Sequence, residues 1–330
     1  MKKTLSIFIC ITLLLCLLTS CRQDPNQAEL TQINIACFPN ITHAQALLMK
    51  GQGTLENIFE QDGLKVNWLT FNAGPSEIEA LFAGEVDIGY IGPVPALSGY
   101  IQSSGDLQII AGASNGGSVL VARNDSAIHS ASDLYGKTIA IPQFGNTQHL
   151  GLLALLTVNG LKPSTHGGTV SVVQSSNADI ANLMERGDID AAFVPEPWGS
   201  ILELNRDGRV VLDYDEVDPN GIPCTAIVIV RKDFLDAFPD AVTSFIQAHK
   251  DATVYINKNM DVAMGIINSQ IAEITQNLID DDVLKSAFNR LQITYEIPVS
   301  SIMDFALIGV DENLLAAMPD NDLTNNTFIK

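Results

Sequence analysis

The sequence is poor in basic residues. Lys and Arg number 18 against 38 Asp and Glu, which gives a formal net charge of −20 over 330 residues. A chain with this excess of negative charge lacks the cationic surface that holds nucleic-acid phosphates. The composition, 46% hydrophobic and 17% charged, also excludes disordered, collagen-like and coiled-coil chains. The length predicts two domains or one large α/β unit.

Cysteine is scarce as well. No C-x-x-C or Cys/His spacing typical of a metal or redox site occurs, and the five histidines form no local cluster. Cys10 and Cys16 lie in an apolar leader, so only Cys37 and Cys224 are expected as free side chains in the folded body. We interpret them as two isolated buried thiols, with a disulfide between them as the alternative. No metal and no cofactor are expected.

The start of the chain has the pattern of a secretory signal. Two lysines precede an apolar run, residues 7–18, that is too short to remain as a membrane-spanning helix. The run ends in Leu18-Thr19-Ser20-Cys21, which resembles a bacterial lipobox with Cys21 as the lipidated residue. A plain signal peptide with an incidental cysteine is the alternative. Residues 1–20 are therefore predicted to be a lipoprotein signal peptide and residues 21–31 a flexible tether.

The remaining chain alternates short β-branched runs with segments of helical periodicity. Strands are expected at residues 33–38, 65–71, 86–91, 107–111, 118–122, 138–141, 170–173, 191–194, 210–212 and 226–230. Strands that alternate with one-sided helices predict an α/β fold with mainly parallel sheets. Beyond residue 232 helical periodicity dominates, and the polar tail, 321–330, is expected to fray.

The domain organisation is less directly marked. Polar loops at 124–126 and 218–221 bracket a block with its own strands and helices. This predicts a first lobe of residues 32–123 plus 223–320 and a second lobe of residues 124–222. A single continuous sheet is also compatible with the pattern.

Two catalytic motifs occur only in part. Gly112-Ala113-Ser114-Asn115-Gly116 matches G-x-S-x-G, but a nucleophile elbow requires a helix after it, and an apolar strand pattern follows here. Gly136-Lys137-Thr138 resembles the end of a P-loop, but Ala131 replaces the required glycine and a strand follows. The sequence therefore predicts no enzyme.

Six polar loops containing Gly or Pro follow predicted strands, and none of them contains Lys or Arg. In open α/β sheets the ligand crevice forms at this end of the strands. Helix N-termini there offer free amides and the positive end of the helix dipole, which together can bind an anion. Ser76 and Glu79 are predicted to form a capping box at one of these helices.

Several of these loops resemble a known family. The residues that carry the resemblance are Phe38-Pro39-Asn40-Ile41-Thr42-His43-Ala44-Gln45-Ala46, Phe71-Asn72-Ala73-Gly74-Pro75-Ser76-Glu77-Ile78-Glu79-Ala80-Leu81, Asp87-Ile88-Gly89-Tyr90-Ile91-Gly92, Pro142-Gln143-Phe144-Gly145-Asn146-Thr147-Gln148 and Val194-Pro195-Glu196-Pro197-Trp198. They are similar to the solute-binding lipoproteins of ABC importers for nitrate, sulfonate and taurine, which include thiamine-pyrimidine binders. The resemblance covers residues 33–255 and implies a type II periplasmic-binding-protein fold, with two α/β lobes around a ligand cleft.

Carried over by position, the resemblance implies eleven ligand-binding residues: Asn40, His43, Ser76, Gly92, Pro93, Asn115, Gly116, Thr147, Gln148, Glu196 and Trp198. Ser76 and Thr147 would donate hydroxyl and backbone hydrogen bonds, one from each lobe. Trp198 would form a flat wall for an organic tail, or with Glu196 a place for an ammonium group.

The expected function is an extracytoplasmic, lipid-anchored binding protein that captures a small anionic or zwitterionic solute, most simply an aliphatic sulfonate or taurine. Its expected partners are an ABC permease and the membrane that holds its lipid, with no nucleic acid, and it is expected to act as a monomer. Nitrate or thiamine-pyrimidine binding by the same fold is the alternative. An enzyme that forms such a pyrimidine is a further alternative. The lipobox and the dispersed histidines argue against it. A receptor sensor domain would need a transmembrane helix and an effector domain.

Overall fold

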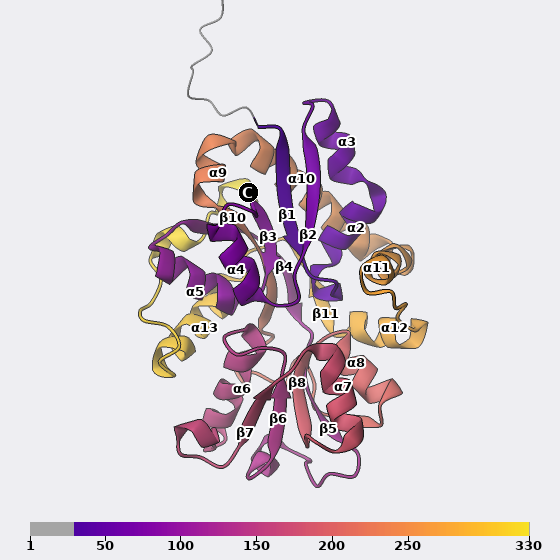
Figure 1. Cartoon of the computed structure of the whole chain (residues 1–330), viewed down its shortest axis with the longest axis vertical. Helices are drawn as coiled ribbons and strands as arrows, with labels where there is room; N and C mark the ends of the chain where they lie inside the picture. Colours follow the sequence, from indigo (N-terminus) through magenta and orange to yellow (C-terminus); the bar gives the residue numbers. More distant parts are fainter. Residues whose placement is uncertain (1–29, 330) are drawn as a thin grey trace, which may run out of the picture. The chain divides into compact units, whose positions relative to one another are not determined.

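The structure is a computed structural model that describes residues 30–329. The proposed signal peptide and Cys21 lie outside the described residues. Residues Gln32–Lys330 form one compact unit that contains two β-sheets (Figure 1). In the described part of the chain no helix is both long and apolar enough to cross a membrane.

The first sheet has six strands in the order β11–β4–β10–β3–β1–β2. Its strands are β1 (Gln32–Cys37), β2 (Lys65–Thr70), β3 (Ile88–Ile91), β4 (Leu107–Gly116), β10 (Cys224–Arg231) and β11 (Leu291–Ile293). β1 is parallel to β2 and β3, whereas β10 is antiparallel to β3 and β4. β3 and the middle of β10 are fully buried, as expected for strands covered on both faces.

The second sheet has five strands in the order β7–β6–β8–β5–β9. They are β5 (Ser118–Arg123), β6 (Thr138–Ile141), β7 (Ser171–Gln174), β8 (Ala191–Pro195) and β9 (Gly208–Leu212). The α/β class is confirmed, but the expectation of mainly parallel sheets is wrong. Among the described strands five neighbouring pairs are antiparallel and four are parallel. The strands that follow each passage between the sheets, β5 and β10, run against their neighbours.

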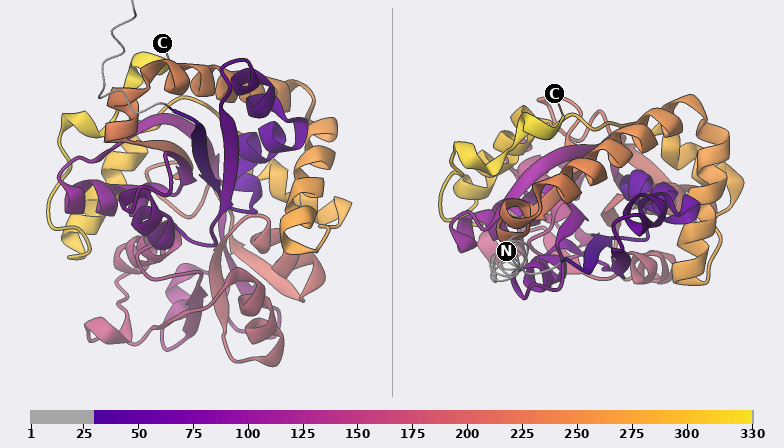
Figure 2. Two further views of the ribbon diagram at one scale, coloured as in Figure 1. Left: turned by 45° about the horizontal axis from the view of Figure 1, so that its top comes forward. Right: turned by 90° about the horizontal axis from the view of Figure 1, so that it is seen from above.

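Helices cover both sheets. The α-helices are α2 (Ala44–Gln52), α3 (Thr54–Glu60), α4 (Gly74–Phe82), α5 (Pro93–Ser103), α6 (Thr147–Val158), α7 (Asn177–Arg186), α8 (Trp198–Asn205), α9 (Lys232–Ala237), α10 (Pro239–Lys258), α11 (Met260–Thr275), α12 (Asp281–Asn289) and α13 (Val299–Asp311). Short 3-10 turns are η1 (Ile41–His43), η2 (Ala131–Leu134), η3 (Ser164–His166), η4 (Asn321–Leu323) and η5 (Asn326–Phe328). The helices that follow β10, orange to yellow in Figure 2, surround the first sheet. Two of them also reach the second sheet's helices, because α12 packs on α8 and α13 on α6.

The helices that begin at the cavity differ in their caps. Asn146 caps α6 by accepting from the His149 amide, and Ser176 caps α7 by accepting from the Asp179 amide. The predicted capping box at Ser76 is wrong, because α4 begins at Gly74 and has Ala73 as its N-cap. Pro75 suits the first turn, so the helix starts before Ser76.

The chain passes between the sheets twice. It leaves β4 at Gly116 and enters β5 at Ser118, and it returns from β9 to β10 through residues 213–223. The sheet therefore changes before β5, whereas the sequence placed the boundary after it, at residue 123. β4 and β5 are both apolar, so the sequence gives no sign that the chain changes sheet between them.

The end of the chain is packed, although its polar composition suggested fraying. The Asn325 amide donates to the Ile109 carbonyl of β4 at 2.9 Å. Leu323 is 1% exposed within the core of the first sheet. The buried Leu323 side chain and the backbone hydrogen bond of Asn325 therefore hold a segment whose polar composition is typical of a frayed end.

Candidate functional site

A cavity of about 850 Å³ lies where the carboxyl ends of strands from both sheets meet. From the first sheet it is lined by the turns after β1, β2 and β3, and from the second sheet by the turns after β6 and β7. The N-terminal ends of η1, α4, α5, α6 and α7 therefore face the same space. Their exposed amides and positive dipole ends make this cavity suited to an anion.

The two α-helices that follow β2 and β3 have no side-chain caps. The N-cap of α4 is Ala73 and that of α5 is Gly92, and neither accepts a hydrogen bond through a side chain. Asn146 and Ser176, in contrast, already accept one amide each in α6 and α7. Pro75, Pro93 and Pro95 have no N–H, so the first-turn donors left for a ligand oxygen are the amides of Gly74 and Ser76 in α4 and of Val94 in α5.

Gly92 and Thr147 bring the two sheets into contact at the cavity. Both residues line it, and a Cβ on Gly92 would clash with the Thr147 hydroxyl. The Thr147 hydroxyl oxygen is buried and has no hydrogen-bond partner among the described residues. A buried polar group without a partner is costly, so this hydroxyl is a natural contact for a ligand.

His43 presents a neutral imidazole. Its Nδ1 accepts a hydrogen bond from the Phe38 amide at 3.0 Å, which leaves the proton on Nε2. Burial lowers the pKa of His43 to about 3. The ring stacks on Phe38 with 4.6 Å between centroids, so its orientation is fixed. His43 can therefore donate one hydrogen bond without carrying a charge.

Asn40 and Gln148 add side-chain amides to the lining. Asn40 accepts from the Thr42 amide through its Oδ1, so its NH₂ group is the part left for a ligand. Gln148 donates to Ser118 at 3.2 Å and accepts from Asn146 at 3.2 Å. Gln148 is thus held in place by its neighbours. It contributes to the shape of the cavity rather than a free hydrogen-bond donor.

Trp198 provides an apolar wall beside these polar groups. It lines the cavity together with Ile201, and it also packs against the core of the second sheet. The cavity is thus polar where helices begin and apolar where α8 passes. This arrangement suits a ligand with an anionic head and an organic tail.

Of the eleven residues implied by the resemblance, six line the cavity: Asn40, His43, Gly92, Thr147, Gln148 and Trp198. The remaining five, Ser76, Pro93, Asn115, Gly116 and Glu196, do not line it. Ser76 is exposed and donates to the Ala73 carbonyl. Pro93 is the buried first residue of α5, and Asn115 and Gly116 end β4 at the passage between sheets.

Glu196 is directed away from the cavity into a polar cluster. Its carboxylate accepts from the Ser200 amide and hydroxyl, and it pairs with Arg290 at 3.1 Å. Burial raises the pKa of Glu196, while these hydrogen bonds and Arg290 oppose the rise. An ammonium group of a ligand would find this carboxylate already engaged.

The cavity extends further than the sequence indicated. Additional lining residues come from the end of α11, the loop before α12 and the end of α8, including Leu278, Ile279, Asp280 and Arg206. These segments follow no strand, so the rule that places ligands after strands could not find them. Arg206 is a basic residue of the lining, and it also pairs with Glu185 at 3.4 Å.

Comparisons with known proteins agree with this architecture. A taurine-binding periplasmic protein of Escherichia coli (strain K12) is 34% identical over 209 residues, which span 63% of this chain and 62% of that protein. A putative aliphatic sulfonates-binding protein of Bacillus subtilis (strain 168) is 26% identical over all of this chain and 96% of its own length. The solved alkanesulfonate-binding protein SsuA of Xanthomonas axonopodis pv. citri, bound to MOPS, shares the fold with a TM-score of 0.74, 19% identity and coverage of 91% of this chain and 100% of its own.

The family model that matches describes the NMT1-like family and covers residues 26–268, which include every predicted strand and the whole set of helix N-termini at the cavity. The chain belongs to the NMT1-like family.

Proposed function

We propose that this protein is the extracytoplasmic solute-binding component of an ABC importer and that its ligand is an organic sulfonate, such as an alkanesulfonate or taurine. The observation that carries the proposal is the convergence of helix N-termini from both sheets on one cavity, with neutral donors beside them and one basic lining residue, Arg206, that is paired with Glu185. The names of the relatives, taurine-binding and aliphatic sulfonates-binding, support the same ligand class.

The chemistry of a sulfonate fits these donors. Its three oxygens carry one permanent charge and can accept hydrogen bonds from several directions at once. The Gly74 amide at the start of α4, the Thr147 hydroxyl and the His43 Nε2 proton would supply them. The tail would lie against Trp198. Nitrate needs no apolar wall, and it would fill only a small part of a cavity of about 850 Å³.

Capture would proceed by closure of two lobes. We assign the first lobe to the first sheet with its helices and the second lobe to the β5–β9 sheet with its helices. A ligand that contacts Gly92 of one lobe and Thr147 of the other favours the closed arrangement by its higher affinity for it. The permease would recognise the closed form, and no bond in the solute is made or broken. In this proposal Cys21 carries the lipid that holds the monomer at the membrane.

The test is calorimetric titration of the protein with taurine, alkanesulfonates of increasing length, nitrate and a thiamine pyrimidine. We expect a sulfonate to bind, and at 1,000 times its Kd to stabilise the fold by about 4 kcal/mol. Binding of the pyrimidine or nitrate without any response to sulfonates would contradict the ligand assignment.

A further inference from the structure

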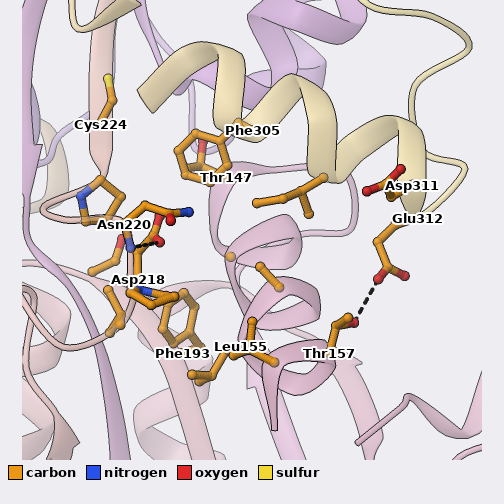
Figure 3. Close-up of a pocket in the computed structure, with 18 residues that line it drawn as sticks. Thr147, Leu155, Thr157, Phe193, Asp218, Asn220, Cys224, Phe305, Asp311 and Glu312 are labelled. Atoms are coloured by element: carbon orange, nitrogen blue, oxygen red, sulfur yellow. Dashed lines mark hydrogen bonds between the residues drawn. The ribbon is translucent and has the colours of Figure 1, made fainter. Parts of the chain in front are cut away.

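A second cavity, separate in its lining from the first except at Thr147, lies between α6 and α13 (Figure 3). Its volume is about 180 Å³. Leu155, Phe193, Phe305 and Ile308 form much of its apolar wall, and the segment before β10 closes one side. We call it the α6–α13 crevice. An apolar cavity of about 150 Å³ is enough to hold a six-carbon ring, so a chain of similar size fits here.

The charged side chains of the crevice are all acidic. Asp218, Asp311 and Glu312 line it, and no Lys, Arg or His does. Within the described chain these three carboxylates take part in no ion pair. Glu312 accepts from the Thr157 hydroxyl at 2.9 Å, which joins α6 to the end of α13 (Figure 3). Asp218 accepts from the Asn220 amide at 2.9 Å.

The backbone adds to this negative potential. Thr157 lies in the last turn of α6, and Asp311 and Glu312 lie at the end of α13. Neither helix has a basic residue in its last turn. Two negative helix ends and two carboxylates are therefore close together, an arrangement that favours a cation.

Thr147 adds a polar group at the end of the crevice that meets the first cavity. This residue is 5% exposed, its hydroxyl oxygen has no hydrogen-bond partner among the described residues, and it lines the crevice as well as the first cavity. The crevice thus combines an apolar interior, an unpartnered buried hydroxyl and an acidic rim. A neutral apolar molecule would gain nothing from the rim, and an anion would be repelled by it.

We propose that the α6–α13 crevice binds an aliphatic ammonium ion, with the alkyl chain between Leu155 and Phe305 and the ammonium group near Asp311 and Glu312. The site goes beyond the sulfonate cavity, because it selects the opposite charge and uses α13, which does not line that cavity. Contact with both α6 and α13 would join elements that belong to different sheets.

The test is titration of the full protein with n-hexylammonium chloride, compared with 1-hexanol and hexanoate. We expect saturable binding of hexylammonium, binding of hexanol about tenfold weaker because it lacks the charge, and no binding of hexanoate. The double variant D311N/E312Q should weaken hexylammonium about tenfold and leave hexanol unchanged. Equal affinity for hexylammonium and hexanol, or no saturation by hexylammonium at about 10 mM, would overturn the proposal.

A second pair of variants locates the site. Ala154 is half-buried and lines the crevice, so Ala154→Phe should fill the space and abolish hexylammonium binding. Ala241, half-buried on α10, lines neither cavity, and Ala241→Phe is the matched control. Sulfonate titrations report separately on the first cavity and show that each variant is folded. Hexylammonium affinity that survives Ala154→Phe in a folded protein places the cation elsewhere and refutes the assignment.

Discussion

The Nη1 atom of Arg290 lies 3.1 Å from Oε1 of Glu196, a side chain with no solvent exposure. Arg290 connects α12 to β11 of the first sheet, whereas Glu196 follows β8 of the second. The same guanidinium also pairs with Glu203 and Asp213, each at 2.9 Å. One cation therefore ties three carboxylates of the second sheet's connections to the first sheet.

This pairing lies next to the passage between the sheets. A Cβ on Gly116 would approach the Arg290 carbonyl oxygen to 2.7 Å, and the Glu196 amide donates to the Gly117 carbonyl at 2.6 Å. Gly116 and Gly117 both have positive φ, 75° and 74°, which glycine adopts without steric cost. Arg290 therefore links the two sheets beside one of the two segments that connect them.

Replacing Arg290 with Met should reduce the free energy of unfolding by about 3–5 kcal/mol, because it leaves the Glu196 carboxylate buried without its partner. Denaturant unfolding monitored by circular dichroism measures the change. Arg186→Met is the matched control, since Arg186 is 61% exposed in its pair with Asp188 and should cost less than about 1 kcal/mol. Equal losses in the two variants would contradict the role given to Arg290.

The buried carboxyl group of Glu77 should make the free energy of unfolding depend on pH. It is 0% exposed in the first turn of α4, and neither carboxylate oxygen has a hydrogen-bond partner among the described residues. Burial raises the pKa of Glu77 well above its ordinary value of 4.5. The native state therefore holds a proton that the unfolded state releases above pH 4.5, so stability is present below that pH and is lost as pH rises toward the native pKa.

Glu77→Gln should remove this loss, because an amide stays neutral at every pH. Relative to the native protein, the variant should gain stability between pH 5 and pH 8, by up to about 1.4 kcal/mol per pH unit. Urea unfolding at several pH values measures the difference. Glu79→Gln, on the exposed side of the same helix, should follow the native profile. A Glu77→Gln profile parallel to the native one would show that Glu77 is ionised in the fold.

The strands and the loops after them were predictable because each leaves a local signal. The run Thr138–Ile141 is a strand with the predicted bounds, and Asn146 caps the helix that follows it as its residue type suggests. The polar loops after β1, β3 and β6 reach the cavity because carboxyl ends of strands converge there. Local pattern and a general topological rule therefore found the loops that contain Asn40, Gly92 and Thr147, and the family resemblance singled out these residues within them.

The remaining features depend on contacts between distant segments. Glu196 follows a strand and has a suitable residue type, but Arg290, 94 positions later, draws its carboxylate away from the cavity. Ser76 has the right type for a cap, yet Pro75 starts the helix earlier and leaves Ser76 on the exposed side. The loop at 276–280 reaches the cavity through the packing of α12 on α8. The contacts of Glu196 and of the loop at 276–280 leave no signal in the local sequence, whereas Pro75 beside Ser76 is a local signal that outweighs the cap preference of Ser76.

Gly92→Ala should weaken sulfonate binding with little loss of fold. A methyl group at this position would clash with the Thr147 hydroxyl, so the two helix N-termini would have to separate at the cavity. Loss of one charge-assisted contact corresponds to about a tenfold rise in Kd. Gly265→Ala is the control, since nothing lies within 4 Å of its Cβ and its φ is not positive. Unchanged sulfonate affinity in Gly92→Ala would show that Gly92 does not contribute to the ligand site.

The protonation state of His43 gives a prediction for binding as well as for stability. Its pKa of about 3 lies below the ordinary value of 6.5 because the ring is buried. Its contribution to stability is therefore complete above pH 6.5 and is lost as pH falls toward 3. Buried His249 contributes to the same loss of stability at acidic pH, because burial lowers its pKa to about 4.

For the sulfonate proposal, a neutral His43 predicts an affinity that does not change between about pH 5.5 and pH 8, because an alkanesulfonate keeps its charge throughout. A cationic His43 would instead lose affinity as pH rises through 6.5, by up to tenfold per unit. Calorimetric titration of an alkanesulfonate at pH 5.5, 6.5 and 7.5 distinguishes the two, with His43→Gln as the reference that cannot titrate. A fall in affinity with rising pH in the native protein that disappears in His43→Gln would mean that His43 binds the anion as imidazolium, against the geometry that fixes its single proton on Nε2.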